Sequence, residues 1–294
     1  MQGPRATAAL SSWAEASWRD PGKPCRMTAA AALWKRILTA PADADLKSHY
    51  VEALSAQGHP RAEMYALAQR YQQLLDSVPT DPAATDQAAA LKPRLDALYA
   101  LALEDFAPAA ARWGAIIHLI GGWPIELTID APGFDRHAAE IVATIPLRHL
   151  DLIAIRDQPD VFGLPQFAQI ASLDGSRQSW SDQALASLAS SAHVGALRWL
   201  NLSQCSITAA QVDVLAASQA LRSVEILDLT DNLAPDPCDA STGYGIDWAS
   251  GGIVPESIQL PGFGWELQEK YGTIRWLNPL WNYMRDYPPS RYSF

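Results

Sequence analysis

The side chains that commonly bind metals or catalyse reactions are present in this sequence, but their spacing matches no known pattern. The histidines include no pair at the spacing that brings two ligands to one helix face. They are His49, His59, His118, His137, His149 and His193. The acidic run from Asp228 to Asp239 lacks the loop pattern of a calcium site. Motifs for a serine nucleophile, a zinc protease, a phosphate loop and a dinucleotide fold are also missing. We therefore expect a non-enzymatic protein with no metal and no cofactor.

The cysteines indicate a reducing environment. Cys25, Cys205 and Cys238 are odd in number and far apart, which fits neither a disulfide framework nor a zinc site. No secretory signal pattern opens the sequence, and the longest apolar patch, Ile116 to Trp123, is too short to span a bilayer. We expect a cytoplasmic protein without a membrane partner.

The acidic residues exceed the basic ones, and the excess is concentrated in one region. The formal net charge is −10 at pH 7, and between Ile125 and Ala240 there are 15 Asp or Glu against 6 Lys or Arg. An acidic surface repels phosphate backbones and attracts basic partners, so we expect a basic protein partner and no nucleic acid. The alternative is that the charge only keeps the fold soluble.

The elements that would position functional groups fall into four segments. Residues 1–26 show no sustained periodicity and are expected to form a loose extension. Residues 27–112 carry helical patterns, with one helix expected to begin at Pro93, and predict a helical domain. Residues 113–240 are predicted to form a repeat domain, and residues 241–294 form an aromatic-rich cap or tail.

A repeat provides the strongest signal in the sequence. Residues 197–205 and 224–232 both match the pattern Leu-x-x-Leu-x-Leu-x-x-Asn/Cys and are offset by 27 residues. A further step of 27 reaches a degraded copy at 170–178, and two steps of 23 reach Leu150 and Leu127. Helical patterns lie between the strands, at 134–144, 182–191 and 209–218. The sequence therefore predicts an α/β fold, a short helical domain followed by a right-handed leucine-rich-repeat solenoid with about five parallel strands and a C-terminal cap.

Strand alternation predicts which side chains face the concave surface of this solenoid. The first predicted column is Glu126, His149, Ser172, Trp199 and Ile226. The second is Thr128, Asp151, Asp174, Asn201 and Asp228, and the third is Asp130, Ile153, Ser176, Ser203 and Thr230. The candidate binding residues on this face are His149, Asp151, Asp174, Trp199, Asn201 and Asp228. Neighbouring carboxylates at Asp151 and Asp174 would favour a basic ligand. The alternative is that Asp occurs here only because the open sheet tolerates a short polar side chain. At the turn that follows each strand, Cys205 and Asn232 are expected to satisfy buried backbone groups.

The last 55 residues are rich in Trp and Tyr. One interpretation is a cap over the apolar end of the solenoid. The other is a partner-binding surface, because aromatic side chains are enriched at interfaces. The candidate binding residues of this segment are Trp276, Trp281, Tyr283 and Tyr287.

The helical region resembles a known bacterial domain. The residues that carry the resemblance are Leu33, Ile37, Pro41, Asp43, Tyr50, Leu54, Gly58, Pro60-Arg61 and Glu63, together with the stretch from Ile125 to Leu150. This pattern resembles the bacterial repeat-companion domain, a family that pairs a short helical module with leucine-rich repeats. Tyr50 is followed by Val51 to Leu54 where the family commonly has Ala-Asp-Trp-Leu. The resemblance implies a repeat-based interaction protein and supplies no catalytic residues.

The expected function is that of a non-catalytic scaffold that binds another protein through the concave acidic face. A more specific alternative is an immunity or neutralising protein for a basic toxin, because opposite charge accelerates association. An enzymatic alternative is a hydrolase or transferase with an unpatterned site between the domains, using groups such as Asp130, His137 and Glu140.

Overall fold

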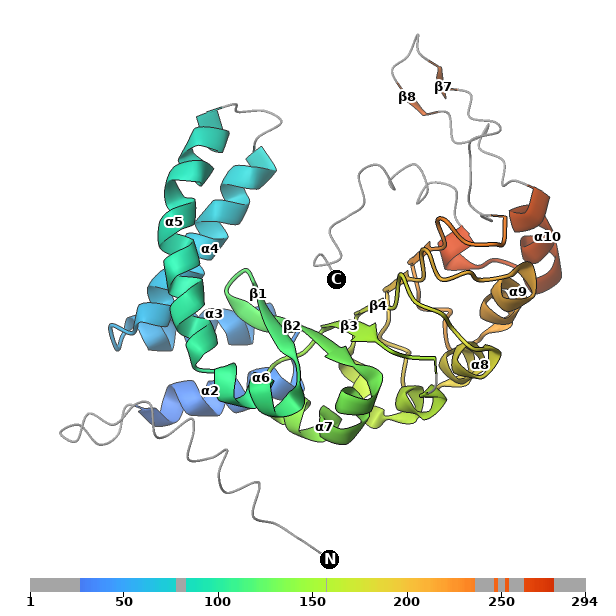
Figure 1. Cartoon of the computed structure of the whole chain (residues 1–294). Coiled ribbons are helices and arrows are strands. Elements are labelled where there is room, and N and C mark those ends of the chain that lie inside the picture. The colour runs from blue at the N-terminus through green and yellow to red at the C-terminus, as the bar shows by residue number, and fades with distance from the viewer. Residues whose placement is uncertain are drawn as a thin grey trace, which may run out of the picture. The chain divides into compact units, whose positions relative to one another are not determined.

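The chain folds as an α/β protein whose helices and six-stranded sheet divide between two compact units (Figure 1). The structure is a computed structural model and describes residues 27–77, 83–156, 158–235, 246–247, 252–253 and 262–277. One unit holds the N-terminal helices with residues 117–125 and 139–147, and the other holds residues 113–116, 126–138 and the chain from 148 onward. The predicted extension 1–26 and the candidate residues Trp281, Tyr283 and Tyr287 lie outside the described residues.

The described part of the N-terminal region contains five helices. They are α2 (Met27–Thr39), α3 (Ala44–Ser55), α4 (Pro60–Ser77), α5 (Ala83–Glu104) and α6 (Ala107–Trp113). Their buried core includes Ile37, Tyr50, Leu54 and Met64. The expectation that a helix begins at Pro93 is wrong, because this proline lies inside α5. Ala and Leu, both strong helix formers, flank it on either side, and α5 packs along α4, which keeps the helix continuous despite the missing backbone donor.

The sheet begins with a hairpin that the repeat pattern does not predict. Strand β1 (Ile116–Ile120) is joined to β2 (Trp123–Asp130) by Gly121 and Gly122, whose φ angles of 58° and 85° lie in the left-handed region. A connection of two residues requires the strands to be antiparallel. At Gly122 a Cβ atom would lie 2.9 Å from the ring of Tyr65, so this turn also needs a residue without a side chain.

Strands β2 to β6 are parallel and adjacent in chain order. After β2 they are β3 (His149–Ile153), β4 (Ser172–Asp174), β5 (Trp199–Asn201) and β6 (Ile226–Asp228). The predicted register is confirmed, because the leucines at 127, 150, 173, 200 and 227 are aligned across the sheet and are all buried. These leucines form what we call the leucine ladder.

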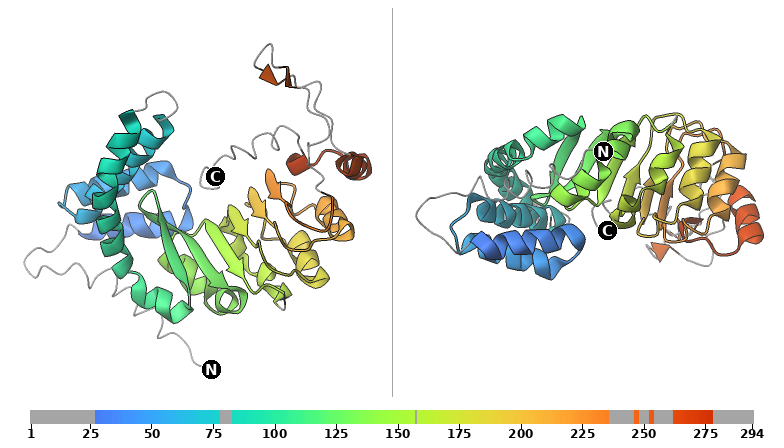
Figure 2. Two further views of the ribbon diagram at one scale, coloured as in Figure 1. Left: turned by 45° about the horizontal axis from the view of Figure 1, so that its top comes forward. Right: turned by 90° about the horizontal axis from the view of Figure 1, so that it is seen from below.

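The connections between the strands place helices along one face of the sheet (Figures 1 and 2). They are α7 (Ala131–Thr144), α8 (Asp182–Ser190) and α9 (Ala209–Ala217), close to the helices predicted from the sequence. Between β3 and β4 the chain instead forms two short 3₁₀ helices, η1 (Pro159–Gly163) and η2 (Pro165–Gln169). Each begins at a proline, which is tolerated in a first turn because its missing N–H needs no partner there.

The turns after β4 and β6 are each held by one side-chain amide, as expected for Asn232. Its Oδ1 accepts hydrogen bonds from the backbone N–H groups of Cys205 and Ile207, both at 2.9 Å, and its Nδ2 donates to the carbonyl of Leu202 at 2.8 Å. Gln178 acts in the same way two repeats earlier, accepting from the N–H of Ile155 at 3.1 Å and donating to the carbonyl of Leu152 at 2.7 Å. These amides join consecutive turns of the backbone.

A left-handed residue recurs in the same turns. Ala154, Arg177, Gln204 and Asp231 have φ angles between 56° and 58°, although none is glycine. They are separated by the same 23- and 27-residue steps as the leucine ladder. The backbone therefore repeats more regularly than the side chains do.

In one repeat a tryptophan replaces a missing leucine. The third Leu of the pattern is present as Leu152, Leu202 and Leu229, but Gly175 stands at this place, directly after β4. A Cβ atom on Gly175 would lie 2.5 Å from Cζ2 of Trp180. The indole of Trp180 is buried, donates from Nε1 to the Gly175 carbonyl at 2.9 Å and stacks on Phe162 at 5.6 Å. The ring of Trp180 therefore occupies the space that the leucine side chain fills in the other repeats.

The described C-terminal elements are the antiparallel strands β7 (Ile246–Asp247) and β8 (Gly252–Ile253), the helix α10 (Gly262–Tyr271) and the 3₁₀ helix η4 (Arg275–Leu277). The two helices pack on the last repeat. Helix α10 contacts α9, and η4 contacts β6. Asp213 of α9 pairs with Lys270 at 2.9 Å and accepts from the hydroxyl of Tyr271 at 2.8 Å. Trp276, predicted as a partner-binding residue, is only 2% exposed, so it belongs to this packed end and presents no surface to a partner.

Candidate protein-binding surface

The candidate surface is the face of the sheet opposite the leucine ladder, which we call the polar sheet face. The first two predicted columns are aligned on it by the strand pairing. The first runs through Glu126, His149, Ser172, Trp199 and Ile226, and the second through Thr128, Asp151, Asp174, Asn201 and Asp228. The third column forms only in part, because Asp130 and Ile153 are paired whereas Ser176, Ser203 and Thr230 lie beyond the ends of their strands.

Three side chains of the second column also close the turn that follows their strand. Oδ1 of Asp174 accepts from the N–H of Ser176 at 3.0 Å, Oδ1 of Asn201 from Ser203 at 2.9 Å, and Oδ1 of Asp228 from Thr230 at 3.0 Å. Asp and Asn stabilise such turns because their short side chains reach the N–H two residues on. A structural role therefore accounts for the residue type at these positions, and it uses one of the two side-chain oxygens of each Asp.

The other interactions within this column run across the strands. Asp151 and Asp174 are directly paired neighbours, as the sequence predicts. Oδ2 of Asp151 accepts from the hydroxyl of Thr128 at 3.2 Å, and Oδ2 of Asp174 accepts from the amide of Asn201 at 3.2 Å. Each carboxylate thus has a neutral donor on its outer side and a like charge on its inner side, an arrangement that a cation would stabilise.

The first column differs from the prediction because most of it is buried. His149 and Ser172 are 0% exposed and Glu126 is 4% exposed, whereas Trp199 and Ile226 are partly exposed. His149 is therefore not an accessible contact residue, and the expectation that it faces solvent on an open sheet is wrong. The partly exposed candidates are Asp151, Asp174, Trp199, Asn201 and Asp228.

Basic residues lie at the opposite end of the same strands. Arg148 precedes β3 and Arg198 precedes β5, and Arg198 Nε lies 3.8 Å from a carboxylate oxygen of Glu225. Burial, with Arg198 nearby, lowers the pKa of the Arg148 guanidinium. The amino ends of β3 and β5 therefore carry basic residues, whereas the acidic Glu225 stands at the same place before β6. Sequence reasoning overlooked this row, although residues 148 and 198 both directly precede a predicted strand.

The residues that could form a catalytic site instead have structural partners. Oδ1 of Asp130 accepts from the N–H of Gly133 at 2.7 Å, and Glu140 forms an ion pair with Arg112. Burial raises the pKa of the Cys205 thiol, which disfavours the nucleophilic thiolate. The part of the chain that the structure describes contains no group of three potential metal ligands. Within the same residues, no helix is long and apolar enough to cross a membrane.

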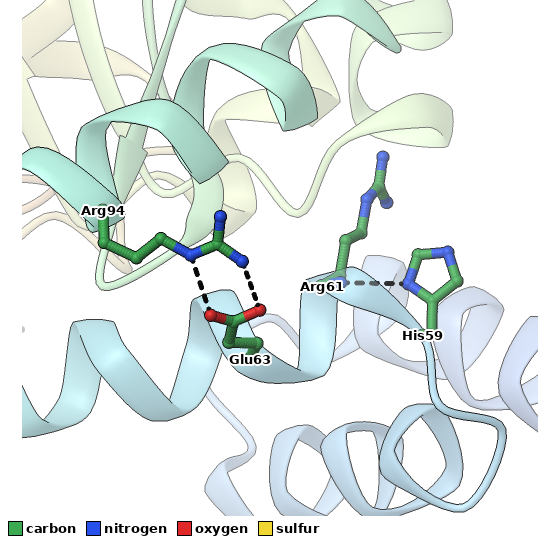
Figure 3. A network of polar contacts seen from close by, with 4 residues as sticks. All are labelled: His59, Arg61, Glu63 and Arg94. Atoms are coloured by element: carbon green, nitrogen blue, oxygen red, sulfur yellow. Dashed lines mark hydrogen bonds and ion pairs between the residues drawn. The ribbon is translucent and has the colours of Figure 1, made fainter.

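A second polar cluster lies at the start of α4 (Figure 3). Nδ1 of His59 accepts from the N–H of Arg61 at 3.1 Å and so caps the helix, while Glu63 forms two hydrogen bonds with Arg94 of α5, at 2.8 and 2.9 Å. The side chain of Arg61 pairs with Asp105 and lies over the ring of Phe106. These contacts tie α4 to α5 and to the residues just beyond its end.

This cluster predicts a pH dependence of stability. Burial, reinforced by the positive charge of Arg61, lowers the pKa of His59 to about 4. Because the unfolded chain binds this proton at a higher pH, the stability contributed by neutral His59 is complete above about pH 6.5 and is lost as the pH falls toward 4. The variant His59→Asn keeps a capping oxygen and does not titrate. Urea unfolding of this variant should therefore show a smaller loss of stability between pH 7 and pH 4.5 than the unchanged protein. Equal losses in both proteins would show that His59 titrates normally.

Comparison with protein-family models, with curated proteins and with solved structures finds no significant match to this chain.

Proposed function

We propose that this chain is a leucine-rich-repeat binding protein of the repeat-companion type, a right-handed solenoid whose polar sheet face binds a basic segment of another protein in a bacterial cytoplasm. The observation that carries the proposal is the acidic column Asp151, Asp174 and Asp228, aligned on the face that α7, α8 and α9 leave uncovered. The 27-residue repeat of the sequence and of the left-handed turns supports the solenoid. The structural partners of Asp130, Glu140 and Cys205 support a non-catalytic role.

The geometry also favours a particular kind of ligand. Turn or cross-strand hydrogen bonds hold the aspartates of the column in fixed positions, with Asp151 and Asp174 about 4.8 Å apart on neighbouring strands and Asp228 two strands beyond Asp174. Trp199 lies beside them, partly exposed, and could stack on an arginine or an aromatic ring. An extended segment that contains Arg and aromatic residues matches both features.

The test replaces the three aspartates by their neutral isosteres. Asp151→Asn, Asp174→Asn and Asp228→Asn keep an acceptor oxygen at each position, which at 174 and 228 can still close the turn, and remove the charge. A labelled peptide of alternating Arg and Tyr is titrated against the full chain, and fluorescence anisotropy gives its affinity. Each lost ion pair is worth about 0.5–1 kcal/mol, so the triple variant should bind about 10- to 100-fold more weakly. Adding Trp199→Ala should abolish measurable binding.

The matched control removes three charges elsewhere. Asp135→Asn, Asp160→Asn and Glu269→Gln lie at exposed positions outside the polar sheet face. This control should change the affinity by less than about twofold at physiological salt, where distant charges are screened. Equal weakening by both triple variants would mean that the peptide responds to net charge alone, and the proposed surface would be wrong.

A further inference from the structure

Strand β1 forms one end of the sheet and has an outer backbone edge. The sheet order runs from β1 to β6, so β1 pairs with a neighbour on one side only (Figure 1). At the other end η4 contacts β6, whereas no strand among the described residues pairs with the outer edge of β1. An edge strand can bind another extended strand through its backbone N–H and C=O groups. Strand β1 therefore has the geometry for strand addition.

The composition of β1 also favours such pairing. Exposed edge strands in proteins are usually protected from pairing by charged residues or by proline. The sequence of β1 is Ile-Ile-His-Leu-Ile, without Lys, Arg, Asp, Glu or Pro. Ile116 is 60% exposed, and His118 and Ile120, which alternation places on the same strand face, are partly exposed. This edge thus lacks the residues that normally prevent association.

The hairpin determines which backbone groups of β1 point outward. Both glycines of the turn between β1 and β2 have positive φ, which is the geometry of a two-residue turn of type I′. In such a hairpin the flanking residues, Ile120 and Trp123, direct their backbone groups toward each other. Because this direction alternates along a strand, Ile117 and Leu119 direct their N–H and C=O groups to the outer edge.

The sequence of β1 is nearly symmetric about its central residue, because Ile and Leu are similar side chains. We propose that β1 pairs in antiparallel orientation with β1 of a second copy of this chain, centred on His118. Ile117 then lies opposite Leu119 of the second copy, and these two equivalent pairs form about four hydrogen bonds through the outward groups. Ile116 lies opposite Ile120 of the second copy, which brings apolar side chains together at both ends.

The symmetry of this arrangement favours a second copy over an unrelated strand. The same five residues supply both halves of the interface, so one sequence satisfies both partners. A two-fold axis at His118 makes the contact isologous, and such a contact closes after two chains instead of growing into a fibre. A single strand pair is a small interface, so we expect a dissociation constant of about 10–100 µM. The interface uses the edge of the sheet and does not depend on the proposed function.

The association state of the full chain provides the first test. Sedimentation equilibrium from about 1 to 300 µM should show a monomer–dimer equilibrium. Ile116→Lys with Ile120→Lys places like charges opposite each other at both ends and should weaken the dimer at least about tenfold. Ile116→Glu with Ile120→Glu should do the same. An equal mixture of the two variants places Lys opposite Glu at both ends, so association should return, which also shows that both variants fold.

The matched control changes two exposed leucines outside β1. Leu75 and Leu101 are 41% and 53% exposed on α4 and α5. Leu75→Lys with Leu101→Lys adds the same charge and should leave the dissociation constant of the dimer within about twofold, because distant charges are screened by salt.

A disulfide tests the register. Opposite residues of an antiparallel pair that exchange no hydrogen bonds have Cα atoms about 4.5 Å apart, which a disulfide can span. In a chain with Cys25→Ser and Cys238→Ser, His118→Cys should therefore form a disulfide between two chains. Oxidised glutathione is the oxidant and is reduced to two glutathione thiols. Ile116→Cys is the matched variant and should not link, because the two positions 116 lie about 14 Å apart in this register.

Three outcomes would overturn the inference. A chain that remains monomeric up to about 300 µM would leave this edge to a strand of another protein. A dimer that forms equally well with Ile116→Lys and Ile120→Lys would place the interface elsewhere on the molecule. Equal cross-linking of the two cysteine variants would contradict the register centred on His118.

Discussion

Gly175→Leu is expected to destabilise the protein by about 3 kcal/mol or more, and Trp180→Ala is expected to restore part of this loss when the two are combined. A leucine at position 175 would enter the space of the Trp180 indole, which a Cβ atom alone would approach to 2.5 Å. The ring cannot move freely, because it is stacked on Phe162 and hydrogen-bonded to the Gly175 carbonyl. Overpacking of a rigid core costs about 1–3 kcal/mol for a few extra methylenes and more when backbone must shift.

The combined variant restores the repeat pattern that the other strands use. Trp180→Ala alone leaves a cavity and should cost about 3–5 kcal/mol. In the double variant the leucine side chain fills the space that the indole has left. The double variant should therefore lose about 1–3 kcal/mol less stability than the sum of the two single losses. Urea unfolding of the four proteins measures this coupling. Gly163→Ala and Gly195→Ala are controls with open space around the added Cβ, and both should be nearly neutral. Strictly additive losses would show that the two side chains do not share one space.

Asn232→Ala is the second substitution with a large expected effect. It removes the acceptor of the Cys205 and Ile207 N–H groups and the donor to the Leu202 carbonyl. A buried backbone group without a partner costs about 1–3 kcal/mol, and three such groups, partly reached by water, should cost about 3 kcal/mol in total. The free energy of unfolding is measured by urea denaturation monitored through tryptophan fluorescence.

The neighbouring residue provides the control for this prediction. Asp231 is exposed and accepts only one hydrogen bond, of 3.3 Å, from Gln204. Asp231→Gly also relieves its left-handed φ of 56°, so this variant should be neutral or slightly stabilising. If both variants lose the same stability, the turn is held by its backbone alone and the bridging amide has no special role.

The repeat explains why so much of the sheet could be predicted from the sequence. The register of a strand depends on the alternation of its side chains and on the length of the connection before it. The spacing of Leu150, Leu173 and Leu200 shows both. The turn amide at Asn232 is equally local, because its partners lie one repeat away. Strand β1 has no repeat partner and was missed for that reason.

The burial of side chains was much harder to predict than their direction. Alternation correctly places His149 on the polar sheet face, but nothing in the period indicates that this side chain is buried. The same limit applies to Pro93, whose helix continues because of packing against α4 that the local sequence does not encode. The sequence does contain a signal for the exchange of leucine for tryptophan, because Gly175 at the leucine position is followed five residues later by Trp180. The function of the candidate surface remains a proposal that rests on charge and geometry.

The C-terminal elements also affect how the molecule behaves in a crowded solution. The outer edge of a terminal parallel strand carries backbone groups that can pair with a strand of another molecule and start a fibre. Beside β6, η4 covers this region, and Arg222 donates to the carbonyls of Tyr271 and Thr273 at 3.2 and 2.8 Å. The contacts of Arg222 and Glu225 hold the C-terminal elements beside the last strand, where these elements hinder strand pairing with a second molecule. Loosening these two contacts would expose an aggregation site while leaving the rest of the sheet folded.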